Sequence, residues 1–375
     1  MIYADNAATT RLDPDALEAM RPWLTGEYGN PSSAYAFARS PKQAIRKARE
    51  TIANAIGALP EEIYFTSGGT ESDNWAVKGT AFANANTSRN KIFVSEIEHH
   101  AVLNSCKFLE HLGYPVGYIS PTKDGIITEK NFRQTLPSDA LMASVMLVNN
   151  ELGTIQPIRE LVALAHAQHT LFHTDAVQAV GHMEIDVRAL GVDMLSASAH
   201  KFNGPKGVGF LYMRSGINLV PYMDGGAQEK GMRAGTENVA GIVGMAVALK
   251  NNIAVIKENK KRIQGLENLF IQNLKQSGVS FVRNGGDNTM PGLISISLPG
   301  KNAEAIMHRL DLVGISISTG SACNSHQTEI SHVLQAISMP KELAEGTIRI
   351  SLGKDNTEAD IEVIVTVLTK LFRLR

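Results

Sequence analysis

The sequence predicts an α/β protein in which a mostly parallel sheet forms a large domain and a smaller α+β unit follows it. Short apolar runs alternate along the chain with stretches whose apolar residues recur at helical spacing. Strands separated by helices are typical of a parallel sheet that is covered on both faces. The length supports this division, since 375 residues amount to two or three domains at roughly 150 residues each.

The elements of the large domain follow from these patterns. In residues 41–56 the apolar side chains of Ile45, Ala48 and Ile52 recur at the spacing of one helix face. Two further helices are expected, at residues 68–82 and 159–169. Apolar runs without that spacing predict strands at residues 62–66, 91–94, 141–148, 171–174 and 193–199.

The smaller unit begins after a long helix. Residues 251–277 have the pattern of one amphipathic helix, and we expect the boundary between the two units near residue 255. A closing helix is expected from Thr357. The strands predicted in this unit are residues 281–283, 292–298, 314–318 and 347–352. Functional residues are expected where the strands of the large sheet end.

Composition and charge exclude several classes of protein. The 36 Lys and Arg residues and 37 Asp and Glu residues leave a net charge of −1, which gives no electrostatic reason to bind nucleic acid or an anionic membrane directly. Cys106 and Cys323 are the only cysteines, too few for a disulfide scaffold or a four-cysteine metal site. No segment has the pattern of a signal peptide or a membrane helix, so we expect a protein of the reducing cytoplasm.

A glycine-rich turn follows the first predicted strand. Gly68, Gly69 and Thr70 stand between the strand at 62–66 and a helical pattern. Backbone N–H groups and the helix dipole at such a turn favour an anion such as a phosphate. The turn lacks the patterns of nucleoside-triphosphate and dinucleotide sites, and an ordinary capped helix is the alternative interpretation.

Two further strand ends carry an acid and an amine. Asp175 follows the strand at 171–174, and Lys201 leaves the strand at 193–199 beside Ser198 and His200. A lysine in this position is a candidate for forming a Schiff base, because burial lowers its pKa. The ordinary alternatives are a helix cap for Asp175 and a solvated lysine, which we prefer for Lys206. A lysine, a carboxylate and a phosphate site together are what pyridoxal phosphate requires.

The motifs as a set resemble the cysteine desulfurases of the NifS and IscS type in the class V aminotransferase family. The matching segments cover nearly the whole chain and are DNAATT (5–10), YGNPSS (28–33), TSGGTES (66–72), EHHAV (98–102), VNNELG (148–153), FHTDAVQ (172–178), HKFNGPKG (200–207), RAGTEN (233–238), SACNS (321–325) and IRISLG (348–353). The resemblance implies a fold type I pyridoxal-phosphate transferase with a seven-stranded sheet. It also implies a large domain of residues 13–255 and a small domain of residues 1–12 and 256–375.

The resemblance assigns a role to each matching residue. Lys201 would hold the cofactor, Asp175 would bind its ring nitrogen, and His99 would stack on the ring and move protons. The other cofactor contacts that it implies are Gly69, Thr70, Asn150, Gln178, Ser198, His200 and, from the neighbouring subunit of a homodimer, Thr236. Arg349 would bind the substrate carboxylate with its two-pronged guanidinium, and Asn150 would also contact the substrate.

The two cysteines differ in their surroundings. Apolar neighbours such as Val102 and Leu109 predict that Cys106 is a core residue. Cys323 lies among small polar residues, and the resemblance makes it the nucleophile that takes sulfur from L-cysteine and leaves L-alanine. His326, three residues further on, is a candidate for lowering the pKa of the Cys323 thiol.

The resemblance also implies partners. Sulfur on Cys323 would pass to an acceptor protein, such as an iron–sulfur scaffold or a tRNA-thiolation enzyme. The segment after Cys323 matches the longer-loop group of the family. Only 22 residues follow Gly353, fewer than in members that dock on a scaffold. This disfavours delivery to a scaffold and leaves tRNA thiolation, thiamine and nitrogenase-type systems as equal candidates.

No resident metal site is expected. His166, His169 and His173 lack a carboxylate or thiol at metal-ligand spacing, and we expect them to be ordinary helix and strand residues. Cys323 would at most be a transient ligand of an iron–sulfur cluster.

Other classes of function stay open at this point. A selenocysteine lyase or another class V aminotransferase would share Lys201, Asp175 and Arg349, but an aminotransferase does not need Cys323. A non-catalytic protein that has kept the fold is disfavoured because Lys201, Asp175 and Arg349 are all present.

Overall fold

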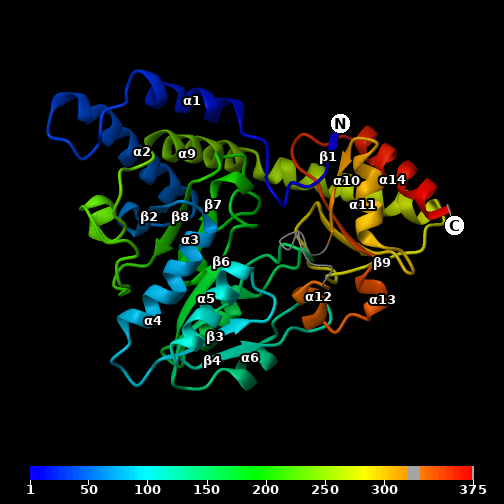
Figure 1. Ribbon diagram of the computed structural model, residues 1–375, viewed down its shortest axis with the longest axis horizontal. Helices are drawn as coiled ribbons and strands as arrows, with labels where there is room; N and C mark the ends of the chain where they lie inside the picture. Colours follow the sequence, from blue (N-terminus) through cyan, green and yellow to red (C-terminus); the bar gives the residue numbers. More distant parts are fainter. Residues whose placement is uncertain (320–329, 374–375) are drawn as a thin grey trace.

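The computed structural model describes residues 1–319 and 330–373 and has a large α/β part and a smaller α+β part (Figure 1). The large part contains a seven-stranded sheet. The strands, in their order across the sheet, are β2 (Ile63–Thr66), β8 (Gly209–Met213), β7 (Met194–Ser198), β6 (Leu171–Asp175), β5 (Ala140–Ser144), β3 (Lys91–Ser95) and β4 (Val116–Ile119). Only β8 is antiparallel to its neighbours. The predicted fold class is confirmed.

Helices cover both faces of this sheet, as the alternation of strands and helices predicts. On one face α2 (Arg39–Ala55), α7 (Ile158–His166) and α9 (Val239–Ala254) pack on strand residues such as Phe172 and Leu195. On the other face the packing comes from α3 (Gly69–Asn74), its continuation through a π-helical turn into α4 (Thr80–Ala83), and α5 (His100–His111). Neighbouring strand residues such as Met194 and Leu195 belong to opposite cores, as the two-residue period of a strand requires.

The smaller part has its own core and two small sheets. One sheet has four strands, in the order β12 (Ser318–Thr319), β13 (Thr347–Ser351), β10 (Leu293–Ser297) and β9 (Val282–Arg283). The other pairs β1 (Ile2–Tyr3) with β11 (Ile315–Ser316). Helices α10 (Ile256–Gln276), α11 (Ala303–Asp311) and α14 (Glu358–Arg373) pack on these strands. The exact domain boundaries stay a prediction.

The remaining helices are short or peripheral. They are α1 (Pro14–Thr25), α6 (Glu129–Thr135), α8 (Val187–Leu190), α12 (His332–Ala336) and α13 (Lys341–Ala344). No single helix in the described part of the chain is long and apolar enough to cross a membrane, although α9 and α10 pass that test of length and composition as a pair bent by 71°.

Several predicted elements have different bounds in the structure. The strand predicted at 141–148 is β5 and ends at Ser144. The helix predicted at 251–277 is broken, because Val255 has non-helical backbone angles (φ −118°, ψ 13°) between α9 and α10. The helix predicted to reach His169 ends at His166, since His169 has a positive φ of 56°. The strand predicted at 314–318 is divided between two sheets.

Candidate active site

The ends of β6 and β7 open into a cavity of about 280 Å³. Its walls come from both parts of the molecule, with the N-terminal segment and Arg349 opposite the ends of the large sheet. The predicted residues that line it are Gly69, Thr70, His99, Asn150, Asp175, Gln178, Ser198, His200, Lys201 and Arg349. Sequence positions 69 to 349 therefore meet in one cavity.

Lys201 projects into this cavity from the turn that follows β7. Its Nζ donates hydrogen bonds to the carbonyl oxygens of Ala7 (2.5 Å) and Ala8 (2.9 Å). The same N-terminal segment is fastened to that turn because both the backbone and the hydroxyl of Thr10 bond the carbonyl of His200 (2.8 Å each). The amine is thus directed across the cavity mouth by backbone groups.

Asp175 is the last residue of β6 and is buried. One carboxylate oxygen accepts a hydrogen bond from the backbone of Val177 (2.8 Å). Burial raises the pKa of Asp175 to about 6, against the lowering effects of that hydrogen bond and of Lys201. A cationic ring nitrogen bound at this carboxylate would favour its charged form.

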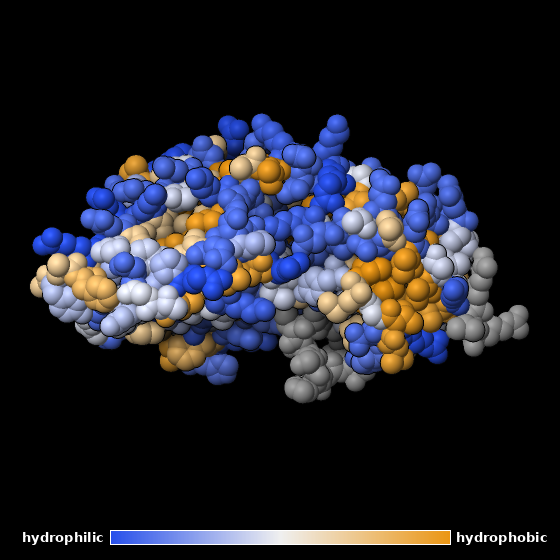
Figure 2. Space-filling view, turned by 90° about the horizontal axis from the view of Figure 1, so that it is seen from above, coloured by the Kyte–Doolittle hydropathy of each residue, from blue (hydrophilic) through white to orange (hydrophobic). Residues whose placement is uncertain are grey.

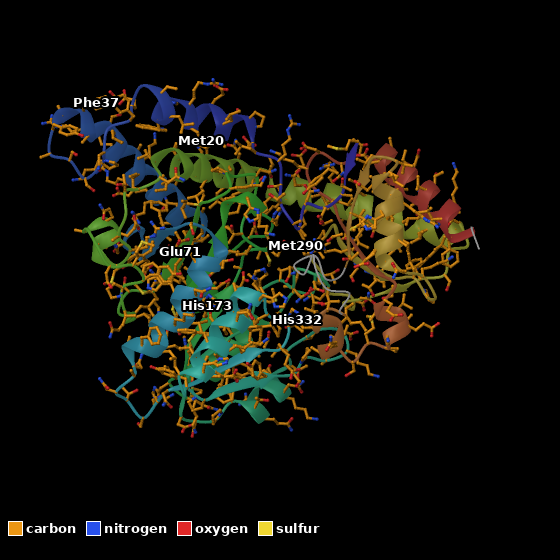
Figure 3. All side chains as sticks on the ribbon, viewed as in Figure 1. Met20, Phe37, Glu71, His173, Met290 and His332 are labelled. Carbon is orange, nitrogen blue, oxygen red and sulfur yellow. The ribbon has the colours of Figure 1, made fainter. Side chains whose placement is uncertain are left out.

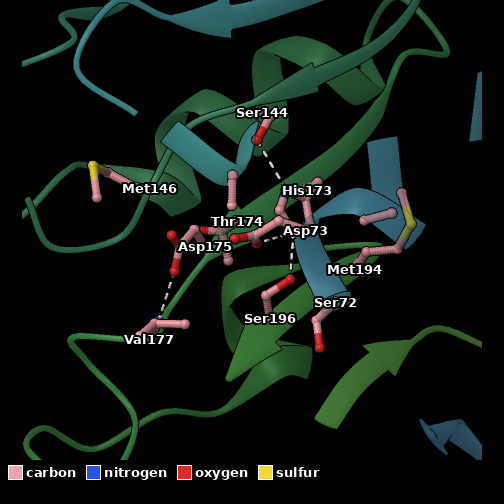
Figure 4. Close-up of polar contacts among 12 residues, drawn as sticks. Ser72, Asp73, Ser144, Met146, His173, Thr174, Asp175, Val177, Met194 and Ser196 are labelled. Atoms are coloured by element: carbon pink, nitrogen blue, oxygen red, sulfur yellow. Dashed lines mark hydrogen bonds and ion pairs between the residues drawn. The ribbon is translucent and has the colours of Figure 1, made fainter. Parts of the chain in front are cut away.

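A second buried carboxyl group, Asp73 on α3, lies behind Asp175 and also lines the cavity (Figure 4). Its Oδ1 is 3.6 Å from Nε2 of His173 and has no hydrogen-bond partner among the described residues. The two nitrogens of His173 bond the hydroxyls of Ser144 (2.8 Å) and Ser196 (2.9 Å). Burial lowers the pKa of His173 to about 3, so this histidine is neutral.

The three buried carboxyl groups near His173, which are Asp73, Glu98 and Asp175, differ in how strongly burial raises their pKa. Burial, followed by the charge of Asp175, raises the pKa of Asp73 well above its ordinary value. Glu98, which bonds Ser95 and the backbone of Met146, is also buried, and burial raises its pKa to about 8. Glu98 is therefore a neutral acid near pH 7, Asp175 carries negative charge there, and burial disfavours a second negative charge on Asp73.

The glycine turn is shaped to admit an anion. Gly68 has a φ of 150°, which favours glycine. A Cβ atom on Gly69 would lie 2.5 Å from Cγ2 of Val177, and one on Gly68 would lie 3.4 Å from the hydroxyl of Ser198. The close approach of backbone that the motif predicts is thus present, with Thr70, Ser198 and His200 around it.

His99 occupies the N-cap position of α5. Its Nδ1 accepts the backbone N–H of Ala101 (3.1 Å). Burial, and then the neighbouring Lys201 and His100, lower the pKa of His99 to about 4. The ring is neutral near pH 7, and because Nδ1 is an acceptor its proton lies on Nε2.

Arg349 comes from the centre of β13 and is almost fully buried. Its Nη1 donates to the carbonyl of Asn150 (2.9 Å), and its Nη2 donates to Oδ1 of Asp5 (2.8 Å). Its Nε has no hydrogen-bond partner among the described residues. A buried donor without a partner is costly, and in a cavity it marks a place for an anionic ligand such as a carboxylate.

One predicted cofactor contact lies away from this cavity. Thr236 does not line this cavity and is exposed, on the segment ahead of α9. Cys323 and His326 lie outside the described residues. Cys106 is buried in α5, as expected, and burial raises its thiol pKa to about 12, which makes it unreactive.

The histidines with no assigned role have carboxylate neighbours that their spacing does not reveal. His166 bonds Asp193 (3.0 Å) and His173 lies 3.6 Å from Asp73; both contacts join residues far apart in the sequence. The described residues contain no group of three or more His, Cys, Asp and Glu side chains arranged to hold a metal ion.

Sequence reasoning missed five residues of the cavity. They are Ala7, Ala8, Asp73, Met146 and Val177. Asp73 directly follows the TSGGTES segment and lies on the helix that begins at the glycine turn. This position was the only sequence signal that it could belong to the site. The others contribute backbone or apolar surface, for which residue type gives no clue.

A family model for aminotransferase class V matches residues 2–364. The chain therefore belongs to the class V aminotransferase family, whose enzymes have fold type I and depend on pyridoxal phosphate.

Individual relatives place the chain more narrowly. Proteins named cysteine desulfurase IscS from Dictyoglomus turgidum and Methanosarcina thermophila are 47% and 44% identical to it, cover 99% of this chain each, and are themselves covered over 94% and 91%. The solved structure of a NifS-like protein matches with a TM-score of 0.93 at 36% identity. The match covers 99% of this chain and 98% of the NifS-like chain. A structure of SspA in complex with cysteine has a TM-score of 0.84 at 38% identity, covering 94% and 99%. Within the family, the chain is one of the cysteine desulfurases.

The cavity fits pyridoxal phosphate by its own chemistry. Lys201 would hold the aldehyde carbon, Asp175 the ring nitrogen, and the glycine turn with Ser198 and His200 the phosphate. Gly69 is required for the close packing of this turn against Val177, because a Cβ there would lie 2.5 Å from Cγ2 of Val177.

Proposed function

We propose that the protein is a pyridoxal-phosphate-dependent cysteine desulfurase that converts L-cysteine to L-alanine and collects the sulfur on Cys323. The observation that carries the proposal is that Lys201, Asp175 and Arg349 line one cavity, and that Nε of Arg349 has no partner among the described residues. Bound there, the cofactor would withdraw electrons from the substrate Cα. The remaining tasks fall to residues of the chain.

Arg349 selects the substrate by its carboxylate. Two of its N–H groups are already used by Asn150 and Asp5, and the Nε edge is left for the ligand. A planar guanidinium held at two points cannot turn away, so the carboxylate is bound in one orientation. That orientation fixes the amino acid between Arg349 and Lys201.

Lys201 is the better candidate to accept the Cα proton. The alternative, His99, has its Nδ1 occupied by the backbone of Ala101 and carries its proton on Nε2. In that tautomer His99 is a hydrogen-bond donor near the ring rather than a base. A proton leaving Cα therefore goes to the amine of Lys201.

Cys323 then takes the sulfur. Its thiolate attacks the substrate sulfur, an S–S bond forms, and the Cβ–S bond breaks with its electron pair left on Cβ. Protonation yields L-alanine, and the equation L-cysteine + Cys323 thiol → L-alanine + Cys323 persulfide balances without another oxidant. Thr319 pairs with Ile348, the neighbour of Arg349 on β13. It is four residues from Cys323, and four residues reach at most about 14 Å.

The sulfur acceptor is proposed from the chemistry of a persulfide, which passes its outer sulfur to another thiolate by exchange. An acceptor protein with an accessible cysteine, such as an iron–sulfur scaffold or a tRNA-thiolation enzyme, fits this requirement. The low net charge of the chain supports contact with tRNA through such a protein rather than directly.

The active unit is proposed to be a homodimer in which Thr236 completes the phosphate site of the other subunit. The segment 227–237 borders a second cavity of about 720 Å³ with residues of 31–49. Next to it Tyr28, Tyr35 and Phe37 are exposed, and Figure 2 shows apolar surface at this end of the molecule. Exposed apolar surface of this kind is typical of an interface.

The test of the proposed function is alanine and sulfide production from L-cysteine, with a thiol present as acceptor, by the wild-type protein and by the Cys323→Ala variant. We expect equal amounts of alanine and sulfide from the wild type and neither from the variant. An aminotransferase would keep its amino-transfer activity in Cys323→Ala, and a selenocysteine lyase would release selenide from L-selenocysteine but little sulfide from L-cysteine. No alanine from the wild type would contradict the proposal.

A further inference from the structure

The short helix α12 is attached to the large domain by polar contacts that the chemistry above does not use. It follows Cys323 in the chain, and Figure 1 shows it close to the large domain, apart from α11 and α14. Its apolar residues Val333, Leu334 and Ile337 share a core with Ile97 and Leu152 of the large domain. The helix is thus packed across the boundary between the two parts.

Two side chains at the start of α12 fasten it to the large domain. The hydroxyl of Ser331 donates to Oε2 of Glu151 (2.5 Å) and accepts the backbone N–H of Val333 (3.1 Å). Nε2 of His332 bonds the carbonyl oxygen of Glu98 (2.9 Å). Figure 3 labels His332 on the side of α12 toward the large domain.

His332 is neutral and well placed to donate. Burial lowers its pKa to about 4, so at neutral pH a proton on Nε2 satisfies the Glu98 carbonyl. Its ring also lies against that of His100, with the ring centres 4.6 Å apart. The contact therefore fixes both the position and the orientation of the side chain.

The two attachment points are next to residues of the active site. Glu98 precedes His99, and Glu151 follows Asn150, whose carbonyl holds Arg349. The side chain of Asn149 bonds the carbonyl of Ile97 (2.9 Å) and joins these two segments to each other. One connected piece of the large domain therefore carries pocket residues on one side and α12 on the other.

We propose that Ser331 and His332 are positioning residues for the sulfur-accepting step, because they fix the chain shortly after Cys323 to the two segments that carry His99 and Asn150. This inference rests on the proposed function. Ser331 is eight residues from Cys323 and Thr319 is four, so fixing both points limits where the thiol can act. A thiol held near the reacting sulfur attacks faster than one free to diffuse over a larger volume.

The experiment separates the step that needs Cys323 from the step that does not. Exchange of the Cα proton of L-alanine with D₂O uses Lys201 and Arg349 but no thiol. Persulfide formation on Cys323 in a single turnover with L-cysteine uses the thiol. Both rates are measured in the holoenzyme for Ser331→Ala and for His332→Phe, which keeps the ring against His100 but removes the donor.

We expect exchange within about twofold of the wild-type rate, and persulfide formation five- to tenfold slower in each variant, which is the loss of about one hydrogen bond. Ser331→Thr, which keeps the hydroxyl, restores the rate. The matched controls change a serine and a histidine of the small domain that do not contact the large domain, in Ser277→Ala and His308→Phe. In these two controls we expect Cα-proton exchange and persulfide formation at the wild-type rates.

Unchanged persulfide formation in Ser331→Ala and His332→Phe would overturn the inference. An equal loss of both rates would also overturn it, because it would show general damage to the pocket. Failure of the proposed function is distinguishable, since the wild-type protein itself would then form no persulfide.

Discussion

The two walls of the active site are held in different ways. The large-domain wall carries Lys201 and Asp175 at the ends of adjacent strands, where sheet hydrogen bonds fix the backbone. The small-domain wall carries Arg349, which donates to the carbonyl of Asn150 in the large domain and to the carboxylate of Asp5 in the N-terminal segment of the small part. The cofactor site is therefore built on the core of one domain. The substrate-binding and sulfur-accepting residues depend instead on contacts between the large and the small domain.

The largest expected effect is on the large-domain wall, at Lys201. Lys201→Ala removes the group that holds the cofactor and accepts the Cα proton, and we expect kcat to fall about a thousandfold. Alanine formation from L-cysteine measures it. A residual rate within tenfold of the wild type would show that another group accepts the proton.

The matching change on the small-domain wall is Arg349→Lys. Lysine cannot offer two parallel donors, so we expect the KM for L-cysteine to rise ten- to hundredfold. The visible absorption of the bound cofactor stays unchanged, because the large-domain wall is intact. A loss of cofactor binding in this variant would contradict the separation of the two walls.

Within the large-domain wall, the two buried aspartates are expected to differ. Asp175→Asn removes the negative charge at the ring nitrogen and weakens cofactor binding about tenfold to a hundredfold. Burial and the charge of Asp175 raise the pKa of Asp73, so we expect Asp73→Asn to weaken cofactor binding less, by under about threefold. Titration of the cofactor-free protein by absorbance measures both affinities, and equal losses in both variants would place the charge on Asp73.

The smallest expected effect concerns Glu98, whose pKa is raised from 4.5 to about 8. The folded protein binds this proton more tightly than the unfolded chain, so its contribution to stability is complete below about pH 4.5 and is lost as the pH rises to 8. Through this one group, the free energy of unfolding falls by at most about 1.4 kcal/mol for each pH unit. Thermal unfolding of the cofactor-free protein at pH 6 and pH 9 measures it.

Glu98→Gln cannot lose a proton, so its melting temperature should fall less than that of the wild type between these two pH values. Parallel falls in the two proteins would contradict the raised pKa of Glu98. Cys106, whose thiol pKa is raised from 9.0 to about 12, is present in both proteins, so the comparison between them removes its contribution.

The large-domain wall could be predicted from the sequence and the small-domain wall only in part. The ends of neighbouring parallel strands meet at one edge of a sheet, so the positions of Asp175 and Lys201 follow from strand patterns alone. Arg349 was assigned by resemblance, and its partner Asp5 lies 344 residues away in the chain, a distance that no local pattern bridges. Asp73 was missed because helical spacing does not show which face turns toward β6.

Elements at the boundary between the two parts were also the hardest to predict. The break at Val255 has no Gly or Pro to mark it, and the strand predicted at 314–318 changes sheets within an unbroken alternation of Ile and Ser. In both places tertiary packing overrides a regular local pattern. The contacts of Ser331 and His332 belong to the same category, since both join segments far apart in the sequence.

The central claim is that a cofactor held by the large-domain wall delivers sulfur to Cys323. The most direct measurement is a single-turnover reaction with L-cysteine in the absence of any acceptor thiol, with alanine quantified and Cys323 analysed by mass spectrometry. The account predicts one alanine per subunit, one added sulfur atom on Cys323 and no alanine from Cys323→Ser. Alanine formed equally by Cys323→Ser, with no sulfur on Cys323 in the wild type, would contradict it.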